Sequence, residues 1–334
     1  MRASFLNKAG DISVREIDVP TLDADQVLVR VESVGICGSD VHYYKHGKIG
    51  PFVVEEPLIL GHELSGVITD VGSEVDSKRI GERVAVEPQR ACGKCEQCIS
   101  GRYNLCPEMQ FYATPPIDGA FCEFVKIQSK FAHAIPESIS FDAAALIEPM
   151  SVCIWAAQKA AIQSGSKVLI AGAGPIGVIM AQVASAMGAS EVVVTDVVAD
   201  RLKFVLKHGA TRVINTATES LGNEKFDAFI DACGVESAVV AGIKATGPAG
   251  RVLLVGLGSD EMKLPISHIQ NNEIIVTGVF RYTNTWPIAI DLLAKKKVNL
   301  DAIITHHFGL DQAEDGLKAT TSPDAMKVIV HPSK

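Results

Sequence analysis

The chain has 334 residues, of which 47% are hydrophobic and 21% are charged, and its formal net charge is −8. This length and hydrophobic content predict a large buried core and about two domains. The acidic balance argues against a nucleic-acid-binding or anionic-membrane surface, because both need clustered Lys and Arg, and it favours an enzyme that acts on small molecules.

The first ten residues contain no apolar segment of the kind that a secretory signal needs, so we expect a cytosolic protein. The most apolar stretch, residues 168–189, is interrupted by Pro175, four glycines and Gln182. It therefore predicts a buried strand, turn and helix instead of a membrane span. Where the eight cysteines cluster, we interpret them as metal ligands, because cytosolic proteins rarely keep disulfides.

The first part of the chain, to about residue 149, contains short β-branched segments separated by Gly, Pro and Asp, which predict a mostly antiparallel β domain. The expected strands lie at 26–33, 64–71, 83–86 and 121–127. No internal repeat or low-complexity tract interrupts this pattern.

From about Ser151 the pattern changes to strands that alternate with helices, which predicts a parallel sheet built from βαβ units. The alternating segments are 167–171, 176–187, 191–195, 199–208, 226–232, 238–245, 251–255 and 273–279. The last 50 or so residues include an apolar-periodic segment at 287–294. They either return to the first domain or form a small cap.

A glycine-rich turn joins the strand 167–171 to the helix that follows it. Its sequence is Gly172-Ala-Gly174-Pro175-Ile176-Gly177, in the context that a dinucleotide-binding G-x-G-x-x-G pattern requires. Glycines let the backbone approach a pyrophosphate, and the helix N-terminus offers free N–H groups to it. Taken alone, the pattern fits an ordinary glycine-rich turn equally well.

Asp196 strengthens the dinucleotide interpretation, because it ends the next strand, 19 residues after Gly177. An acidic residue at this place accepts hydrogen bonds from the adenine ribose hydroxyls. A carboxylate here repels the 2′-phosphate of NADP, so we expect NAD. Arg201 lies close enough in sequence to approach a phosphate, although a partner for Asp196 or a solvated helix residue explains it too.

Four cysteines, Cys92, Cys95, Cys98 and Cys106, lie within fifteen residues, close enough to form one tetrahedral metal site. An iron–sulfur cluster is the main alternative, but the final seven-residue spacer is too long for the ferredoxin pattern. The flanking charges are balanced, so no basic nucleic-acid-binding face is expected. The spacing predicts a structural zinc, since four thiolates leave no open coordination position.

A catalytic zinc needs an open position, so its ligands must lie outside this loop. Donor residues occur in three short motifs, around Cys37, at His62-Glu63, and at Glu148-Pro149. Taken singly, each residue also fits a structural role. Cys37 could be a small core residue, His62 a satisfied buried histidine and Glu148 a helix-capping carboxylate.

Taken together, these motifs resemble those of the zinc-containing medium-chain dehydrogenase/reductase family, and of its polyol (sorbitol and xylitol) dehydrogenase branch in particular. The resemblance covers nearly the whole chain and is carried by residues 34–44, 61–66, 113–119, 145–149, 172–177, 255–258 and 279–287. It implies an α/β fold with a GroES-like, mostly antiparallel β catalytic domain (1–149), a Rossmann doubly wound parallel sheet domain (150–280) and a C-terminal segment (281–334) that returns to the catalytic domain.

The resemblance also implies the catalytic zinc ligands: Cys37, His62 and a glutamate. Glu63 and Glu148 are both possible, one bound directly and the other through water. A carboxylate in place of the second cysteine of simple alcohol dehydrogenases gives harder oxygen ligation, which suits a vicinal diol. We therefore expect two zinc ions per chain, NAD, a polyol substrate, and a homotetramer or homodimer formed through edge strands of the cofactor domain.

In the implied reaction, the substrate hydroxyl binds zinc, its proton leaves to Glu148 through water or along Ser39 and His42, and hydride passes to NAD. The resemblance places Tyr43, Phe111, Arg281 and Tyr282 in the polyol pocket. An interdomain salt bridge would explain Arg281 as well. The cofactor contacts that we expect are Gly172, Gly174, Pro175, Ile176, Gly177, Asp196, Arg201, Val255, Leu257 and Val279.

Two features depart from the animal sorbitol enzymes. The four-cysteine loop is complete here, and residues 117–120 read Ile-Asp-Gly-Ala where those enzymes have Asp-Asp-Gly-Asn. Xylitol, ribitol or another polyol is therefore a possible preferred substrate. The alternative enzyme is a zinc dehydrogenase that acts on threonine, a simple alcohol or an aldehyde. The alternative without catalysis is a metal-free relative that binds a nucleotide for a structural or regulatory purpose.

Overall fold

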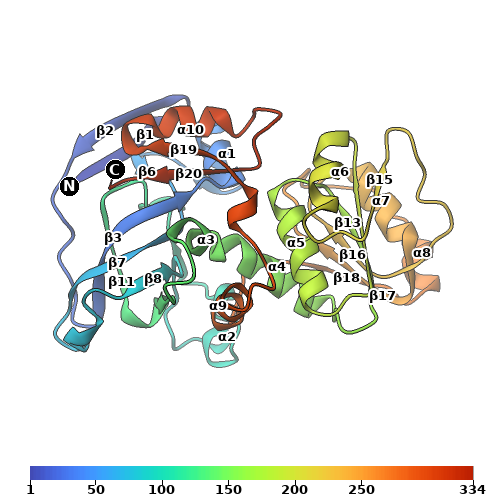
Figure 1. Cartoon of the computed structure of the whole chain (residues 1–334), viewed down its shortest axis with the longest axis horizontal. Coiled ribbons are helices and arrows are strands. Elements are labelled where there is room, and N and C mark those ends of the chain that lie inside the picture. Colours follow the sequence, from blue (N-terminus) through green and yellow to red (C-terminus); the bar gives the residue numbers. More distant parts are fainter. Residues whose placement is uncertain (334) are drawn as a thin grey trace. The chain divides into compact units, whose positions relative to one another are not determined.

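The computed structural model describes residues 1–333, which form two compact units (Figure 1). Unit 1 contains Met1–Glu148, Trp286–Ala294 and the chain from Leu300 onward, and unit 2 contains Pro149–Thr285 and Lys295–Asn299. The chain crosses from one unit to the other within helix α4 (Ile147–Lys159). Residues 281–285 therefore belong to unit 2. The chain after them belongs to unit 1, apart from Lys295–Asn299.

Unit 1 is built on a sheet with the strand order β12-β8-β7-β3-β20-β19, and β11 also pairs with β3. Its pairs are antiparallel except for β19 and β20, which run parallel. The strands of this sheet are β3 (Gln26–Gly35), β7 (Glu63–Val71), β8 (Arg83–Val86), β11 (Phe124–Gln128), β12 (Ala132–Ala134), β19 (Ile304–Gly309) and β20 (Lys327–His331). The predicted antiparallel β domain is confirmed.

Smaller elements complete unit 1. A second sheet has the order β2-β1-β6, and short hairpins pair β4 with β5 and β9 with β10. The strands are β1 (Arg2–Lys8), β2 (Asp11–Glu16), β4 (Lys48–Ile49), β5 (Phe52–Val53), β6 (Leu58–Ile59), β9 (Gln89–Arg90) and β10 (Gln110–Phe111). The helices are α1 (Gly38–His46), α2 (Glu96–Ile99), α3 (Phe141–Ala145), α9 (Trp286–Ala294) and α10 (Ala313–Ala319).

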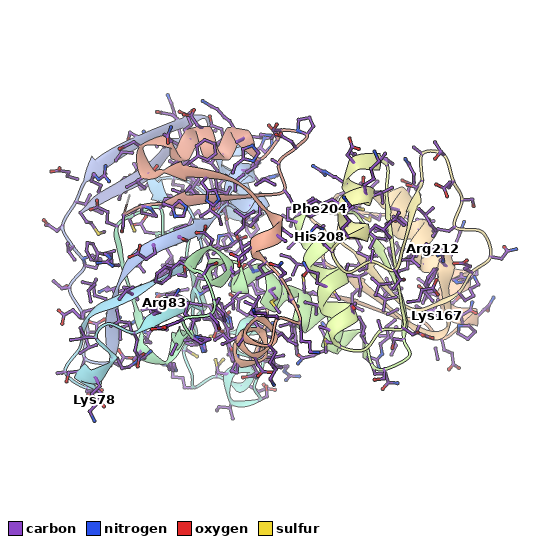
Figure 2. The ribbon with its side chains drawn as sticks, in the orientation of Figure 1. Lys78, Arg83, Lys167, Phe204, His208 and Arg212 are labelled. Atoms are coloured by element: carbon purple, nitrogen blue, oxygen red, sulfur yellow. The ribbon has the colours of Figure 1, made fainter. Side chains whose placement is uncertain are left out.

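The core of unit 1 forms between these sheets, where apolar side chains such as Leu6, Leu60 and Phe121 are fully buried. Arg83 fastens the segment that leads into α3. Arg83 is labelled in Figure 2. Its guanidinium lies 4.4 Å from the ring centroid of Phe141 and donates to the carbonyls of residues 136 and 139. These contacts hold the start of α3, the helix that carries Asp142.

Unit 2 is a parallel sheet with the order β15-β14-β13-β16-β17-β18, which is the doubly wound Rossmann order. The strands are β13 (Lys167–Ala171), β14 (Glu191–Asp196), β15 (Arg212–Asn215), β16 (Phe226–Asp231), β17 (Thr246–Leu254) and β18 (Ile275–Gly278). The helices are α5 (Pro175–Ala186), α6 (Ala199–Leu206), α7 (Glu236–Ala245) and α8 (Ile266–Asn271). This confirms the predicted fold class.

The sequence explains why this sheet forms. Strand β13 is nearly continuously apolar and buried, as strands of a parallel sheet covered on both faces must be. Helices α5 and α6 lie on one side of the strands, and α7 and α8 on the other (Figure 1). No helix among the described residues is both long enough and apolar enough to span a bilayer.

Candidate zinc and cofactor sites

Three predicted zinc ligands, Cys37, His62 and Glu63, lie together in unit 1. One donor atom from each lies within 4.8 Å of the others. Antiparallel pairing brings them together, because Gly35 at the end of β3 is the register partner of Glu63 at the start of β7. A Cβ at Gly35 would lie only 2.1 Å from a carboxylate oxygen of Glu63, so this close approach requires glycine.

Asp40 organises this donor group, and sequence reasoning gave it no role. Its carboxylate is fully buried and accepts the N–H groups of Cys37 and Gly61, each at 2.9 Å. It also lies 3.7 Å from Nδ1 of His62. A carboxylate behind one ring nitrogen fixes the tautomer and leaves the other nitrogen for a metal.

The charges around His62 favour a metal site. Burial lowers the pKa of His62, but the carboxylate of Asp40 and the sulfur of Cys37 together raise it well above its ordinary value. Burial likewise raises the pKa of Asp40, but His62 and two backbone amides bring it below the usual value. The carboxylate of Asp40 and the sulfur of Cys37 thus favour a positive charge at His62.

Lys327 on β20 is the second partner that the sequence did not reveal. Its ammonium lies 2.7 Å from Oε1 and 2.6 Å from Oε2 of Glu63, and it donates to the carbonyl of Ile36 at 2.8 Å. Both charged side chains are at most 5% exposed. The sequence did contain a sign of this pair, because Lys327 interrupts the apolar segment 325–330. Lysine is rarely buried without a partner.

The other predicted catalytic residues, Glu148, Ser39 and His42, are not part of the Cys37–His62–Glu63 donor group. Glu148, in the first turn of α4, is 5% exposed and near enough for its charge to raise the pKa of Lys327, but it is outside the donor group. Ser39 is half-buried and His42 exposed, three residues apart on α1. The roles of Glu148, Ser39 and His42 in proton transfer therefore stay a prediction.

Of the predicted substrate residues, Phe111 lies beside the donor group, with its ring centroid 5.4 Å from that of His62. Tyr43 is buried on α1. The other two belong to unit 2. Tyr282 is fully buried, and the guanidinium of Arg281 lies 4.7 Å from the ring centroid of Phe280.

The four clustered cysteines also come together in unit 1. The sulfurs of Cys92, Cys95, Cys98 and Cys106 lie within 4.8 Å of one another. Two of the sulfur–sulfur separations, 3.9 Å for Cys92–Cys98 and 3.5 Å for Cys95–Cys98, bracket the roughly 3.8 Å edge of a tetrahedral zinc–thiolate site. Backbone N–H groups of Lys94 and Cys95 lower the pKa of Cys92 to about 7, whereas burial raises the pKa of Cys98 to about 12, so the cluster favours a thiolate at Cys92 in particular.

In unit 2 the glycine-rich turn has the geometry that its sequence predicts. Gly172 has a φ of +104°, and a Cβ at Gly177 would lie 1.8 Å from the carbonyl oxygen of Gly172. A Cβ at Gly174, the N-cap of α5, would meet no atom within 4 Å. The helix N-terminus is therefore open to a ligand, and Pro175 occupies its first turn without losing a hydrogen bond.

Asp196 lines a pocket together with Gly172, Val197, Thr216 and Cys233. Its Oδ2 accepts the N–H of residue 173 at 2.7 Å, and its Oδ1 accepts the N–H of residue 198 at 2.9 Å. The first of these bonds ties the carboxylate to the glycine-rich turn. The pocket and turn together fit the adenosine and pyrophosphate parts of a dinucleotide.

The remaining predicted cofactor residues lie on helix α6 and just after two strands of unit 2. Arg201 is half-buried on α6, and Leu257 is 70% exposed after β17. The N–H groups of Val255 and Val279 bond to the carbonyls of residues 231 and 254, which places both residues at the carboxyl ends of parallel strands, where such sheets bind ligands.

One prediction follows from Asp40. In Asp40→Asn the charge behind His62 is lost, so we expect zinc affinity at the Cys37–His62 group to fall about 10- to 100-fold. Competition with a zinc chelator, followed by metal analysis, measures the effect. Asp70→Asn is the matched control, because Asp70 is exposed on β7, and an equal loss of zinc in both variants would contradict the assigned role.

A β unit with two groups of zinc donors, joined in one chain to a Rossmann unit, is the architecture of a zinc-binding dehydrogenase. Comparison with known families agrees. Residues 23–137 match the alcohol dehydrogenase GroES-like domain, and residues 175–295 match the zinc-binding dehydrogenase family.

Individual relatives cover nearly the entire chain. Sorbitol dehydrogenase of Bacillus subtilis (strain 168) is 41% identical over 100% of this chain and 98% of its own length, and human sorbitol dehydrogenase is 42% identical over 96% and 93%. A short chain alcohol dehydrogenase from E. coli CFT073, solved in complex with NADH, superposes with a TM-score of 0.93 at 30% identity over 99% of both chains. The chain belongs to the zinc-containing medium-chain dehydrogenase/reductase family, in the branch of its sorbitol dehydrogenase relatives.

Proposed function

We propose that this protein is a zinc-dependent dehydrogenase that oxidises a polyol with NAD to the corresponding ketose, or catalyses the reverse reduction. The observation that carries the proposal is the Cys37, His62 and Glu63 group, one sulfur, one nitrogen and one carboxylate donor within 4.8 Å. Three protein donors leave an open position for a substrate hydroxyl. The sorbitol dehydrogenase relatives support a polyol substrate.

Cys37, His62 and Glu63 would hold the catalytic zinc, and the four cysteines of residues 92–106 the structural one. Bound zinc supplies Lewis acidity that makes a coordinated hydroxyl far more acidic, and bound NAD supplies the hydride acceptor. In our proposal Glu148 receives the substrate proton through water, or Ser39 and His42 pass it along α1 to solvent. Phe111, beside His62, closes one wall of the site and excludes water.

The cofactor would bind to unit 2. The open N-terminus of α5 would receive the pyrophosphate, and Asp196 would accept the adenine ribose hydroxyls. The NADH in the E. coli CFT073 structure supports a nicotinamide dinucleotide. We propose in addition that β18, an edge strand of this sheet, pairs with a second copy in a homodimer or homotetramer, and that the protein works in the cytoplasm.

Steady-state kinetics with sorbitol, xylitol, ribitol, galactitol, threonine and ethanol would test this function, with NAD and NADP compared. We expect NAD-dependent oxidation of at least one polyol, lost after chelation of the labile metal and restored by zinc. Turnover of threonine or ethanol without any polyol would identify one of the alternative dehydrogenases. No turnover by a chain that retains both zinc ions would favour a binding role.

Cofactor choice gives a separate prediction. In Asp196→Ala the ribose hydroxyls lose a charged acceptor that is worth about 1.5–3 kcal/mol, so kcat/KM for NAD should fall roughly 10- to 100-fold. The value for NADP should change less or rise, because the repelling carboxylate is gone. Asp200→Asn is the control, since Asp200 is exposed on α6 and paired with Lys203. Equal losses with both cofactors would speak against ribose recognition by Asp196.

A further inference from the structure

A second group of metal donors lies in unit 1, on residues outside the zinc motifs. Asp142, His307 and His331 each offer one ligand atom, and these atoms lie within 4.8 Å of one another. They border a pocket that Phe308 and Gly309 complete. From this arrangement we propose a third metal site, which binds a divalent transition-metal ion through two imidazoles and one carboxylate.

The topology of the sheet creates the site. Strands β19 and β20 run parallel, and the register places His331 opposite Gly309 and His307 opposite Ile329. Residues two apart on a strand share a face, so the two histidines lie diagonally on the same face. Gly309 has no side chain opposite His331, which leaves room on that face of the sheet for both rings. Their planes are 11° from parallel.

The separations of the donor atoms suit a single ion. Nδ1 of His307 lies 3.1 Å from Nε2 of His331 and 3.6 Å from Oδ2 of Asp142. Two nitrogens bound at the usual zinc distance in a tetrahedral site are about 3.3 Å apart. The alternative to a metal is an N–H···N hydrogen bond between Nδ1 of His307 and Nε2 of His331. Such a bond would not involve Oδ2 of Asp142.

The groups behind His331 and Asp142 hold both side chains in the orientation that a metal site needs. Nδ1 of His331 donates to the carbonyl of Glu32 at 3.0 Å and lies 3.4 Å from Oγ of Ser33, so its lone pair is on Nε2, facing His307. Ser33 also donates to Oδ1 of Asp142, which leaves Oδ2 for a ligand. Metal-binding histidines and carboxylates are typically held in this way from behind.

The exposed fractions of the three side chains fit a site that can exchange its metal with solvent. The side chain of His331 is 8% exposed, that of Asp142 24% and that of His307 51%. Because its ligands come from β19, β20 and the first turn of α3, a bound metal would connect these three elements. Imidazole and carboxylate donors without a thiolate favour Zn²⁺, Ni²⁺, Cu²⁺ or Fe²⁺ over softer ions.

Zinc titration of the full-length chain, already loaded with zinc at its thiolate-containing sites, would test the site. We expect a third equivalent of Zn²⁺ by equilibrium dialysis and metal analysis. His307→Ala and Asp142→Asn should each weaken its binding by more than the roughly 10- to 100-fold that loss of an outer-shell partner costs. His307 is half exposed, so the first variant should fold normally.

Two control variants separate this site from adventitious binding to surface histidines. His306→Ala removes the neighbouring ring on β19, and His46→Ala breaks the exposed pair in which the rings of His42 and His46 lie 4.6 Å apart. Both should keep the third equivalent. A wild-type chain that binds no third ion, or a third ion lost in His46→Ala and kept in His307→Ala, would overturn the proposal.

Cobalt provides an independent readout that does not use enzymatic activity. Co²⁺ added to the zinc-loaded chain should produce d–d absorption without the thiolate-to-metal charge-transfer band, because none of the three proposed ligands is a cysteine. Appearance of that band with the third equivalent would assign the ion to a cysteine site and reject the Asp142–His307–His331 site.

Discussion

In the chain stripped of its catalytic zinc, Lys327→Met should destabilise unit 1 by about 3–5 kcal/mol, because it leaves the carboxylate of Glu63 buried without a cation. Both oxygens of Glu63 lie within 2.7 Å of the lysine ammonium, and the two side chains are nearly inaccessible to solvent. Unfolding of unit 1 can be followed on its own, since Trp286 belongs to unit 1 and Trp155 to unit 2. Denaturant titration monitored by Trp286 fluorescence in a Trp155→Phe background would measure the change.

The double variant Lys327→Met/Glu63→Gln tests the cause. Removing both charges leaves no uncompensated ion, so the double variant should be more stable than Lys327→Met alone. Equal stability of the single and double variants would mean that the lysine acts through packing of its alkyl chain and not through its charge.

The sequence predicts best those parts of the site whose residues are close in the chain. The four cysteines at 92–106 are spaced so that one loop can bring them together, and they meet as expected. The glycine-rich turn is equally local, because strand, turn and helix α5 are consecutive. In both cases short-range geometry restricts the possible structures, so a motif is enough.

Partners that come from distant segments could not be predicted in the same way. Lys327 meets Glu63 across 264 residues, and His307 and His331 meet Asp142 only because β20 pairs with β3 in the sheet. Such pairings depend on strand order and register, which no local pattern encodes. Asp40 was close in sequence to Cys37, but its role depends on the turn at Gly61, whose N–H it accepts.

The choice between the two glutamates as zinc ligand gives the largest expected effect on activity. Glu63 lies in the donor group with Cys37 and His62, whereas Glu148 lies outside it. Glu63→Gln should therefore lose the catalytic zinc, leaving one zinc per chain after dialysis against a weak chelator, with little activity. Glu148→Gln should keep both ions, while kcat/KM falls about 10²- to 10⁴-fold as expected for loss of a proton acceptor.

Glu63→Gln also removes the partner of Lys327, and it leaves this lysine as an uncompensated cation beside the metal site. Such a cation repels zinc whether or not Glu63 is a ligand. Lys327→Met/Glu63→Gln removes that repulsion, so a chain that still lacks the catalytic zinc would have lost a ligand. If zinc returns in the double variant, or if Glu148→Gln is the variant that loses it, then Glu148 is the carboxylate ligand and Glu63 serves to anchor β20 to the site.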